Sequence, residues 1–400
     1  MKQITDLISM LTDPWMYAVA LALFIAITLL VFLFYKRPAF AGKKKHPPLP
    51  ADSASLPGVS VVLCARNEYD NLTELLPLLL EQKYPVFQIV VVNKNSEDNT
   101  EILLASLEHF HKNLTIRTLT SDRKFGEDSL MALGIGVRAA IHPYVVFFRP
   151  DCRPVSDRWL ASLVRSSVER SADTVTGYTS LSKNGLFVRY YSMEQQLHQM
   201  GMSDLNLPYA STGNNVLFLK KRFLEEQEFN TYTTAFSRCE QAIAAHVMQV
   251  GKNKQALEVQ SVDAIRRTAS CTYPEGRVVF TRKLPGKEYR LRHIQRLQTL
   301  ILTKGWPYVL LILEKTLVAA FYVFLALIFK NAYPWSEPVA WAFPAGLLLL
   351  RWITVWVHHA GYRAHLGEKN LVYTAPLWDV FSPVVYFYYL IVLLYKRIKN

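Results

Sequence analysis

The sequence contains few cysteines, and their spacing suits neither a metal site nor a disulfide framework. Cys64, Cys152, Cys239 and Cys271 are the only four in 400 residues, and no two of them form a C-x-x-C pair. Zinc sites and disulfide scaffolds both need cysteines at short, regular spacings. We therefore expect reduced thiols and a fold that depends on its hydrophobic core.

Acidic residues are scarce relative to basic ones. The chain has 32 Asp and Glu against 45 Lys and Arg, which gives a formal net charge of +13. An excess of this sign is typical of proteins that bind nucleic acid, anionic lipid or a phosphate-bearing substrate. The positions of the basic residues decide among these three.

Charged residues are missing altogether from Trp15–Tyr35, which is long enough to cross a bilayer as a helix. A secretory signal peptide is the alternative, but the run is long for one and no small-residue cleavage site follows it. Lys36, Arg37 and residues 43–45 follow instead, and all are basic. By the positive-inside rule they place the N-terminus outside and the next domain in the cytosol.

Three further apolar stretches lie near the C-terminus, at Tyr308–Phe329, Pro338–Val357 and Pro376–Tyr395. Three full spans that start in the cytosol would put the basic residues of 396–399 outside, against the charge rule. Either one stretch is interfacial or re-entrant, or the orientation of the first helix dominates. The sequence leaves both alternatives open.

Between these apolar segments, short β-rich runs alternate with helical patterns. Glu68–Gln82, for example, places four leucines on one helical face. Strands that alternate with helices predict βαβ units and a parallel sheet, that is, an α/β fold. The predicted strands are Val59–Cys64, Gln88–Val92, Leu114–Leu119 and Tyr144–Phe148, and a second helix is expected to begin near Asp98.

Polar loops follow three of the predicted strands, at residues 65–68, 93–100 and 149–154. Ligands of parallel sheets bind beyond the carboxyl ends of the strands, so these loops are expected to form one site. The site would combine carboxylates with helix N-termini, which suits a nucleotide diphosphate.

Five segments of this region resemble motifs of the family 2 glycosyltransferases, in the same order and at usual spacings. They are VSVVLCARNE, VVVNKNSEDNT, GEDSLMALGI, FFRPDCRPVSDRWL and TGNNVLFLKKRF. The resemblance covers about residues 57–300 and implies the GT-A fold, a Rossmann-like domain for nucleotide-diphospho-sugars. The flanking apolar segments are similar to those of the family's membrane-anchored members.

The resemblance also implies functional residues and a cofactor. In the family, a D-x-D motif holds Mg²⁺ or Mn²⁺ on the diphosphate, and Asp151 is the metal ligand that this implies here. The residues implied for nucleotide-sugar binding are Glu68, Asn93, Lys94, Asp98, Arg149 and Asp151. Those implied for the acceptor side are Asn214, Asn215 and Gln295, and the implied catalytic base is Glu240.

The chain departs from the family pattern at several chemically important positions. Lys94 stands where the family usually has an aspartate, and Glu127 where a lysine is common. Arg149 occupies the first acidic position of the D-x-D motif. Glu240 is the one acid left in Ser237–Gln241, where the family has an acidic cluster with its general base. Of a later Q-x-x-R-W motif, the chain keeps only the glutamine.

These departures leave three interpretations. Inverting sugar transfer needs a base near the acceptor hydroxyl, which Glu240 could supply, and positive charge on the leaving diphosphate. Lys94 and Arg149 could supply that charge in place of a metal. Asp151 alone could hold a metal together with phosphate oxygens. In the third interpretation the fold was retained after catalysis was lost, and these side chains form salt bridges with their neighbours.

Structural alternatives exist for other candidates too. Asp98 could cap the following helix, and Glu68 could stabilise the N-terminus of the helix that it opens. Asn214 and Asn215 could form a tight loop after Gly213.

The segment Arg282–Lys304 holds seven basic residues and one acid. Four apolar side chains would align on one helical face, with Arg292 and Arg296 opposite. This pattern is typical of a helix at a membrane surface. It favours lipid over nucleic acid as the partner of the basic residues.

We therefore expect a membrane-anchored α/β protein of the GT-A class, without a nucleic-acid partner. Its predicted function is sugar transfer from a nucleotide-diphosphate sugar to a lipid-linked or polysaccharide acceptor. The alternative is an inactive relative that scaffolds or regulates an active glycosyltransferase subunit. We expect an integral protein of the plasma (inner) membrane with the α/β domain in the cytosol. The expected parts are an N-terminal segment (1–14), a membrane helix (15–35), a linker (36–56), the GT-A domain (57–281), an interfacial region (282–307) and about three membrane helices (308–395).

Overall fold

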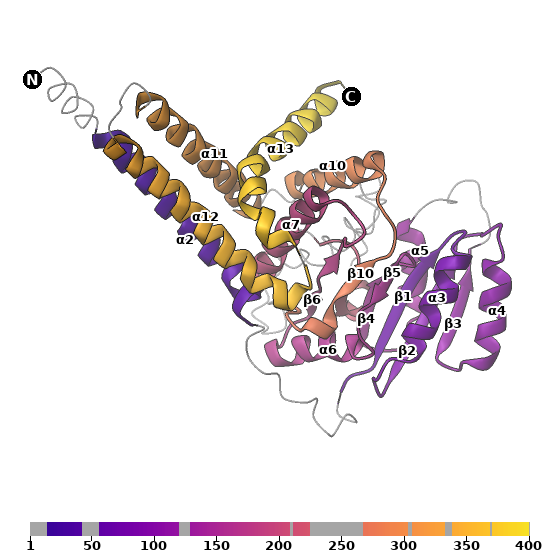
Figure 1. The fold of residues 1–400 in the computed structure, drawn as a ribbon. Helices are drawn as coiled ribbons and strands as arrows, with labels where there is room; N and C mark the ends of the chain where they lie inside the picture. The colour runs from indigo at the N-terminus through magenta and orange to yellow at the C-terminus, as the bar shows by residue number, and fades with distance from the viewer. Residues whose placement is uncertain are drawn as a thin grey trace, which may run out of the picture.

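The computed structural model describes residues 14–41, 56–119, 129–208, 211–224, 267–302, 306–332, 338–368 and 370–399. Figure 1 shows an α/β domain at one end and a group of long helices at the other. The chain passes from the long helix α2 (Pro14–Ala41) into the α/β domain and then returns to the helices α10 to α13.

The domain is built on a seven-stranded mixed sheet with the order β3-β2-β1-β4-β8-β6-β9. β1 pairs in parallel with both β2 and β4, whereas β8 pairs antiparallel with its two neighbours. The strands are β1 (Val59–Ala65), β2 (Phe87–Asn93), β3 (Leu114–Thr118), β4 (Tyr144–Phe148), β6 (Thr174–Thr176), β8 (Val216–Leu219) and β9 (Thr268–Ser270). The predicted α/β fold is thus confirmed, and each predicted strand lies within one residue of its observed bounds.

Helices cover both faces of the sheet. Successive side chains of β1 point to opposite faces, so neighbouring residues pack against different helices. Leu63 packs in the cluster with α3 (Tyr69–Leu80), α4 (Thr100–Phe110) and α6 (Trp159–Arg170). Its neighbour Val62 belongs to the cluster on the other face, with α5 (Ser129–Ala139). Both faces of the central strands are therefore buried, which explains their uninterrupted apolar sequences.

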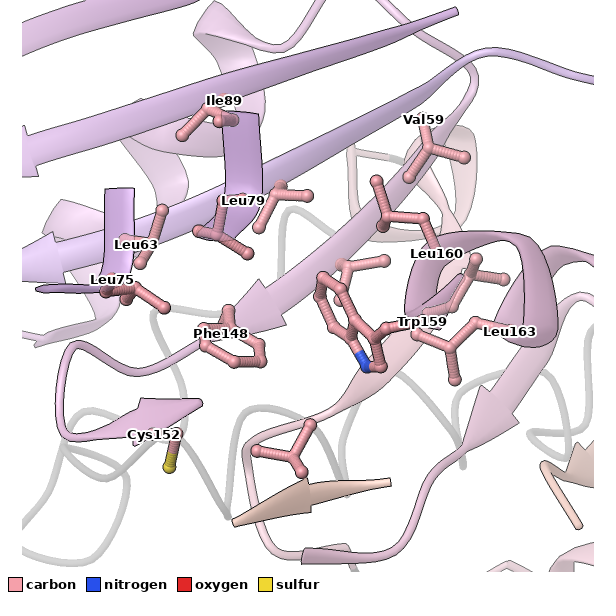
Figure 2. Packing of buried hydrophobic residues seen from close by; sticks show 14 of the residues in the cluster. Val59, Leu63, Leu75, Leu79, Ile89, Phe148, Cys152, Trp159, Leu160 and Leu163 are labelled. Carbon is pink, nitrogen blue, oxygen red and sulfur yellow. The ribbon is translucent and has the colours of Figure 1, made fainter. Parts of the chain in front are cut away.

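Trp159 anchors the first of these clusters. Its ring lies 4.7 Å from that of Phe148, centroid to centroid, and is fully buried. Figure 2 shows the two rings side by side, with Leu160 and Leu163 of α6 beside Trp159. Phe148 is the last residue of β4, so this packing fixes where the polar loop after β4 begins.

A second, three-stranded sheet has the order β5-β10-β7. β5 (Cys152–Pro154) pairs antiparallel with β10 (Val278–Phe280), so that Cys152 lies opposite Phe280. β7 (Thr179–Ser180) pairs in parallel with β10. This small sheet brings the segment after residue 280 next to the loop that follows β4.

The remaining elements are mostly helical. Three of the described helices are long and apolar enough to cross a membrane, with the apolar windows Trp15–Phe32, Val309–Lys330 and Leu371–Tyr395. In Figure 1, α2 and α12 run side by side, and α13 leads away from the α/β domain at an angle to them. The helices not yet given are α7 (Leu186–Asp204), α8 (Lys220–Leu224), η5 (Pro274–Gly276), α10 (Gly286–Leu302), α11 (Trp306–Ala332), α12 (Pro338–Leu366) and α13 (Leu371–Lys399).

Buried charges among the long helices are paired. Arg351 of α12 donates to both carboxylate oxygens of Asp379 in α13, at 2.9 and 2.7 Å. Lys315 of α11 lies 2.8 Å from Glu194 of α7 and 3.3 Å from its neighbour Glu314. An unpaired charge in an apolar helix bundle is costly, so these pairs join helices as well as neutralising the charges. α7 thereby links the α/β domain to the long helices.

A second link is made by Glu368, in the connection between α12 and α13. Its buried carboxylate accepts hydrogen bonds from Tyr178 (2.8 Å) and Ser180 (2.6 Å) of the small-sheet region. It also accepts two from Arg189 of α7, at 3.1 and 2.7 Å. Four donors thus converge on one carboxylate that lies far from them in sequence.

We predict that Glu368→Gln loosens the long helices from the α/β domain. The substitution removes the negative charge that accepts two hydrogen bonds from Arg189, whose side chain is 12% exposed, and breaking a buried pair costs about 3–5 kcal/mol. Thermal unfolding in detergent should show a lower midpoint, and limited proteolysis should show faster cleavage around residue 368. The control is Glu275→Gln, because Glu275 is exposed. Equal midpoints for the two variants would contradict the prediction.

Candidate nucleotide-sugar site

The three polar loops predicted to form a site do meet at one edge of the sheet. Ala65 at the end of β1 lies opposite Asn93 at the end of β2. Leu63 of β1 lies opposite Phe148, the last residue of β4. Because the three strands are parallel and in register, the loops that follow them leave the sheet side by side.

The loops after β1 and β2 are joined by hydrogen bonds around Asn67 and Asn93. The carboxamide oxygen of Asn67 accepts from the Glu97 amide at 2.8 Å, and the Asn67 amide donates to Oγ of Ser96 at 3.0 Å. The buried carboxamide of Asn93 accepts from the amide and hydroxyl of Ser96, at 3.1 and 2.7 Å. Asn93 therefore shapes the loop from within. Asn67 has a φ of 54°, a conformation that asparagine adopts more readily than most residues.

Asp98 accepts hydrogen bonds from the first residues of two helices, α4 and α3. One carboxylate oxygen accepts from the Thr100 amide at 3.1 Å, and the other from the Tyr69 amide at 3.2 Å. Slight burial opposes ionisation, but the hydrogen bonds from Thr100 and Tyr69 lower the pKa of Asp98 below its usual value. These contacts match the capping role that the sequence left as an alternative for Asp98.

Glu68 lies at the start of α3 and is half-buried. Burial raises the pKa of its carboxyl group, and the negative charge of Asp151 adds to the rise. A hydrogen bond of 2.6 Å from Asn71 and the charges of Arg149 and Arg282 act in the opposite direction. Glu68 is therefore electrostatically coupled to the loop after β4, which brings it into the same site as Asp151.

Lys94 is half-buried at the carboxyl end of β2. Its amide donates to the Ala65 carbonyl at 2.8 Å, which continues the pairing of β1 and β2 by one residue. Lys94 is thus the first residue of the loop after β2, and it lies between the ends of β1 and β2.

Asp151 forms the centre of the loop after β4. Arg149 donates to both of its oxygens, from Nε and from Nη2, at 2.9 Å each. Burial alone would raise the pKa of Asp151, but Arg149 and the nearby Arg292 and Arg282 lower it. The carboxylate is consequently ionised and turned inward, with its side chain 4% exposed.

Two further arginines reach Asp151 from the segment after β10, and the sequence did not predict this. Nε of Arg282 lies 3.4 Å from Oδ2 of Asp151, and Nη2 of Arg292 lies 4.0 Å from the same oxygen. Both also contact Glu288, at 2.6 and 2.7 Å. The helical pattern had placed Arg292 opposite the apolar face of an interfacial helix. The short β-rich run at 278–280 was the available signal that this segment returns to the sheet.

The donor atoms around Asp151 do not fit a divalent cation. Mg²⁺ and Mn²⁺ take several oxygen ligands, commonly from more than one carboxylate. Here a single buried carboxylate has both oxygens occupied by arginine N–H groups. Three guanidinium charges lie within 4.0 Å of it. Within the described ranges of the chain, no group of three or more His, Cys, Asp or Glu side chains is placed to hold a metal.

Asn214 and Asn215 are both buried, and their side chains bond to the protein. Asn214 accepts from the Arg149 amide at 3.0 Å, so it positions the loop that carries Asp151. Asn215 accepts from the indole N–H of Trp159 at 2.9 Å. It also donates to the carbonyls of Tyr178 and Gly276, at 3.1 and 3.0 Å. These contacts favour the structural alternative for both residues.

The side chains of two predicted site residues, Glu240 and Gln295, are not described by the structure. Glu240, the candidate base, lies outside the described residues, as does Glu127. Gln295 lies on α10, the helix that carries Arg292, but its side chain is not among those described. The structure therefore brings together the loops that carry the residues predicted to bind the nucleotide sugar, but not the predicted base.

One protein family matches part of the α/β domain. Residues 60–227, which include all three loops, match the family model described as Glycosyl transferase family 2. This segment is therefore similar to the family 2 glycosyltransferases, and it contains most strands of the mixed sheet.

Individual relatives are more distant. Glycosyltransferase AglE of Haloferax volcanii is 28% identical over 179 residues, which are 44% of this chain and 56% of AglE. The chain thus covers only about half of the length of that curated relative.

Two solved structures are similar in outline. A mannosyltransferase from Pyrobaculum calidifontis, in complex with GDP-Man and Mn²⁺, is 19% identical with a TM-score of 0.47, over 92% of this chain and 98% of that one. S. aureus TarS 1–349, in complex with UDP-GlcNAc, is 12% identical with a TM-score of 0.39, over 81% and 88%.

We predict that Asn215→Ala destabilises the α/β domain by about 3 kcal/mol. The substitution removes the partner of the Trp159 indole N–H and of the Gly276 carbonyl, and each such buried group costs about 1–3 kcal/mol before relaxation. Chemical denaturation followed by circular dichroism measures the change. Asn95→Ala is the matched control, because Asn95 has a similar positive φ (50° against 58°) but is exposed. A similar loss in both variants would assign the effect to backbone strain instead.

Proposed function

We propose that the protein is a membrane-anchored glycosyltransferase. It transfers a sugar from a nucleotide-diphosphate sugar to a lipid-linked or polysaccharide acceptor at the cytosolic face of the membrane. The observation that carries the proposal is the convergence of three polar loops at one sheet edge, within a segment similar to the family 2 glycosyltransferases. The loops bring Glu68, Lys94 and Asp151 to the edge where parallel sheets bind ligands.

In this proposal the loops bind the donor and Glu240 activates the acceptor. The acceptor hydroxyl oxygen attacks the anomeric carbon of the sugar while the bond from that carbon to the diphosphate oxygen breaks. Glu240 takes the hydroxyl proton, as a general base does. The diphosphate leaves with its electron pair, and positive side chains stabilise its growing charge. Attack opposite the leaving group inverts the anomeric configuration.

The arrangement of the long helices supports an acceptor that is held at a membrane. α7 and the Glu368 contact join the α/β domain directly to helices that are long enough to cross a bilayer. The donor site and the apolar helices are therefore parts of one structure. A plasma (inner) membrane, with the α/β domain on its cytosolic side, is the location proposed from the basic residues after Trp15–Tyr35.

A second candidate function is a non-catalytic partner of an active glycosyltransferase. The observation in its favour is the pair of hydrogen bonds between Arg149 and Asp151, which occupies the carboxylate that the resemblance assigns to a metal. In this case the site would bind a donor or a product without turnover.

We predict that Glu240→Gln lowers sugar transfer by about 100- to 10,000-fold, the usual contribution of a general base. Donor affinity should stay the same, because the base contacts the acceptor. The assay uses the full chain in detergent, a panel of radiolabelled UDP- and GDP-sugars and a lipid extract as acceptor. The control is Glu101→Gln, an exposed residue of α4.

The same assay separates the two functions. Transfer by the unaltered chain alone, lost in Glu240→Gln, supports the enzyme and rules out the non-catalytic partner. Donor binding with neither transfer nor donor hydrolysis supports the partner. No binding of any nucleotide sugar would contradict both.

A further inference from the structure

We propose that Arg149, Arg282 and Arg292 form a metal-independent binding site for the diphosphate of the donor, with Asp151 as their buried counter-ion. The inference rests on the proposed function for the identity of the ligand. It assigns binding roles to two arginines that lie outside the matched family segment 60–227.

The pairing of β5 with β10 puts the three arginines in one place. Asp151 precedes β5, and its carbonyl accepts hydrogen bonds of 3.0 Å from both the amide and the hydroxyl of Thr281, which follows β10. Arg282 is the next residue, so backbone contacts fix its position beside Asp151. The cluster thus depends on a strand pair and not on the chance meeting of long side chains.

An aromatic ring holds the two later arginines at a fixed spacing. The guanidinium carbon of Arg282 lies 5.3 Å from the ring centroid of Phe280, and that of Arg292 lies 5.1 Å from it. Phe280 itself is buried in the core of the domain. Because guanidinium groups stack favourably on aromatic faces, the ring orients both arginines before any ligand arrives.

The cluster presents its positive charges outward and its negative charge inward. The side chain of Asp151 is 4% exposed, whereas those of Arg149, Arg282 and Arg292 are 24%, 42% and 18% exposed. An approaching ligand therefore meets guanidinium groups and not the carboxylate. The three arginines contact two carboxylates, those of Asp151 and Glu288.

Arg292 also keeps hydrogen-bond donors for a ligand. Arg292 bonds to Glu288 through Nη2, and within the described parts of the chain its Nε and Nη1 make no hydrogen bond. Guanidinium groups bind phosphate oxygens through two parallel N–H donors, which makes arginine well suited to phosphate recognition. The site lies at the end of β4, where a diphosphate would otherwise be held by a metal.

Asp151 has a clear role in this site without a metal. Three guanidinium groups confined to a few ångströms repel one another, and a buried carboxylate among them offsets that repulsion. Hydrogen bonds from Arg149 to both of its oxygens favour the ionised carboxylate. A counter-ion and a metal ligand differ in one testable respect. Removing the negative charge of a counter-ion does not weaken anion binding, whereas removing a metal ligand weakens the binding that depends on the metal.

The first test measures the binding of inorganic pyrophosphate, UDP and GDP to the full chain in detergent by calorimetry. Each titration is run with EDTA and again with Mn²⁺. We expect the same affinity in both conditions for every ligand that binds. Binding that requires Mn²⁺ would overturn the inference.

The second test removes one arginine at a time. Arg282→Gln and Arg292→Gln should each weaken the binding of pyrophosphate and nucleoside diphosphate by about tenfold or more, as expected for the loss of a charge-assisted hydrogen bond. Arg290→Gln removes the same charge from an exposed position on α10 and should leave the affinity unchanged. Equal losses in all three variants would point to a general effect of charge and would overturn the specific site.

The third test uses Asp151→Asn. Loss of a counter-ion raises the positive charge of the site, so the affinity for pyrophosphate should stay equal or increase, although the unfolding midpoint should fall. Loss of a metal ligand would instead weaken Mn²⁺-dependent binding. A folded variant, judged by circular dichroism, that binds pyrophosphate more than about tenfold more weakly would contradict the inference.

These outcomes separate the inference from the proposed function. Metal-independent binding of pyrophosphate without binding of any nucleotide sugar would keep the anion site and reject the glycosyltransferase proposal. Transfer that requires Mn²⁺ would keep the glycosyltransferase and reject the metal-independent site. Absence of both kinds of binding would reject both.

Discussion

The parallel, in-register pairing of β1 with β2 and β4 is the constraint on which the donor side of this protein depends. β2 ends level with β1, and β4 ends two residues earlier, so the loops after Ala65, Asn93 and Phe148 share one edge. Hydrogen bonds between Asn67 and residues 96–97 then hold two of these loops together. Packing of Trp159 on Phe148 fixes the third. Most of the polar residues here serve to hold the loops in position, so the number that could contact a ligand is small.

Asp151 shows how one position of a motif can keep its place and change its chemical surroundings. The aspartate still ends the loop after β4, as the resemblance predicts. Its neighbour at the first motif position is Arg149, and the small sheet adds Arg282 and Arg292. A carboxylate surrounded in this way is already neutralised. Its surroundings therefore favour anions over cations, which reverses the preference expected of a metal site.

The sequence predicted the α/β class, the strands and the three loops well, because alternating apolar runs and polar strand ends are local features. It predicted less of what depends on contacts between distant segments. The sequence placed Arg292 on the polar face of a helix, but helical periodicity cannot show that β10 pairs with β5 and that the following segment brings Arg292 near Asp151. The hydrogen bonds of Asn215 with Trp159 and Gly276 likewise join segments whose proximity only the fold reveals, and an acceptor-side role of Asn215 stays a prediction. Contact of α10 with a membrane surface stays a prediction.

The contact of Glu368 with the small-sheet region has a mechanical consequence. β7 ends at Ser180, which donates to Glu368, and β7 pairs with β10, which leads to Arg282. A short, continuously bonded path therefore runs from the turn between two long helices to the arginines beside Asp151. A tilt of α12 or α13 relative to the sheet cannot be absorbed by a loose linker along this path. A force that changes the tilt of these helices, such as one from a surrounding bilayer in the proposed location, would thus act on the spacing of the guanidinium groups.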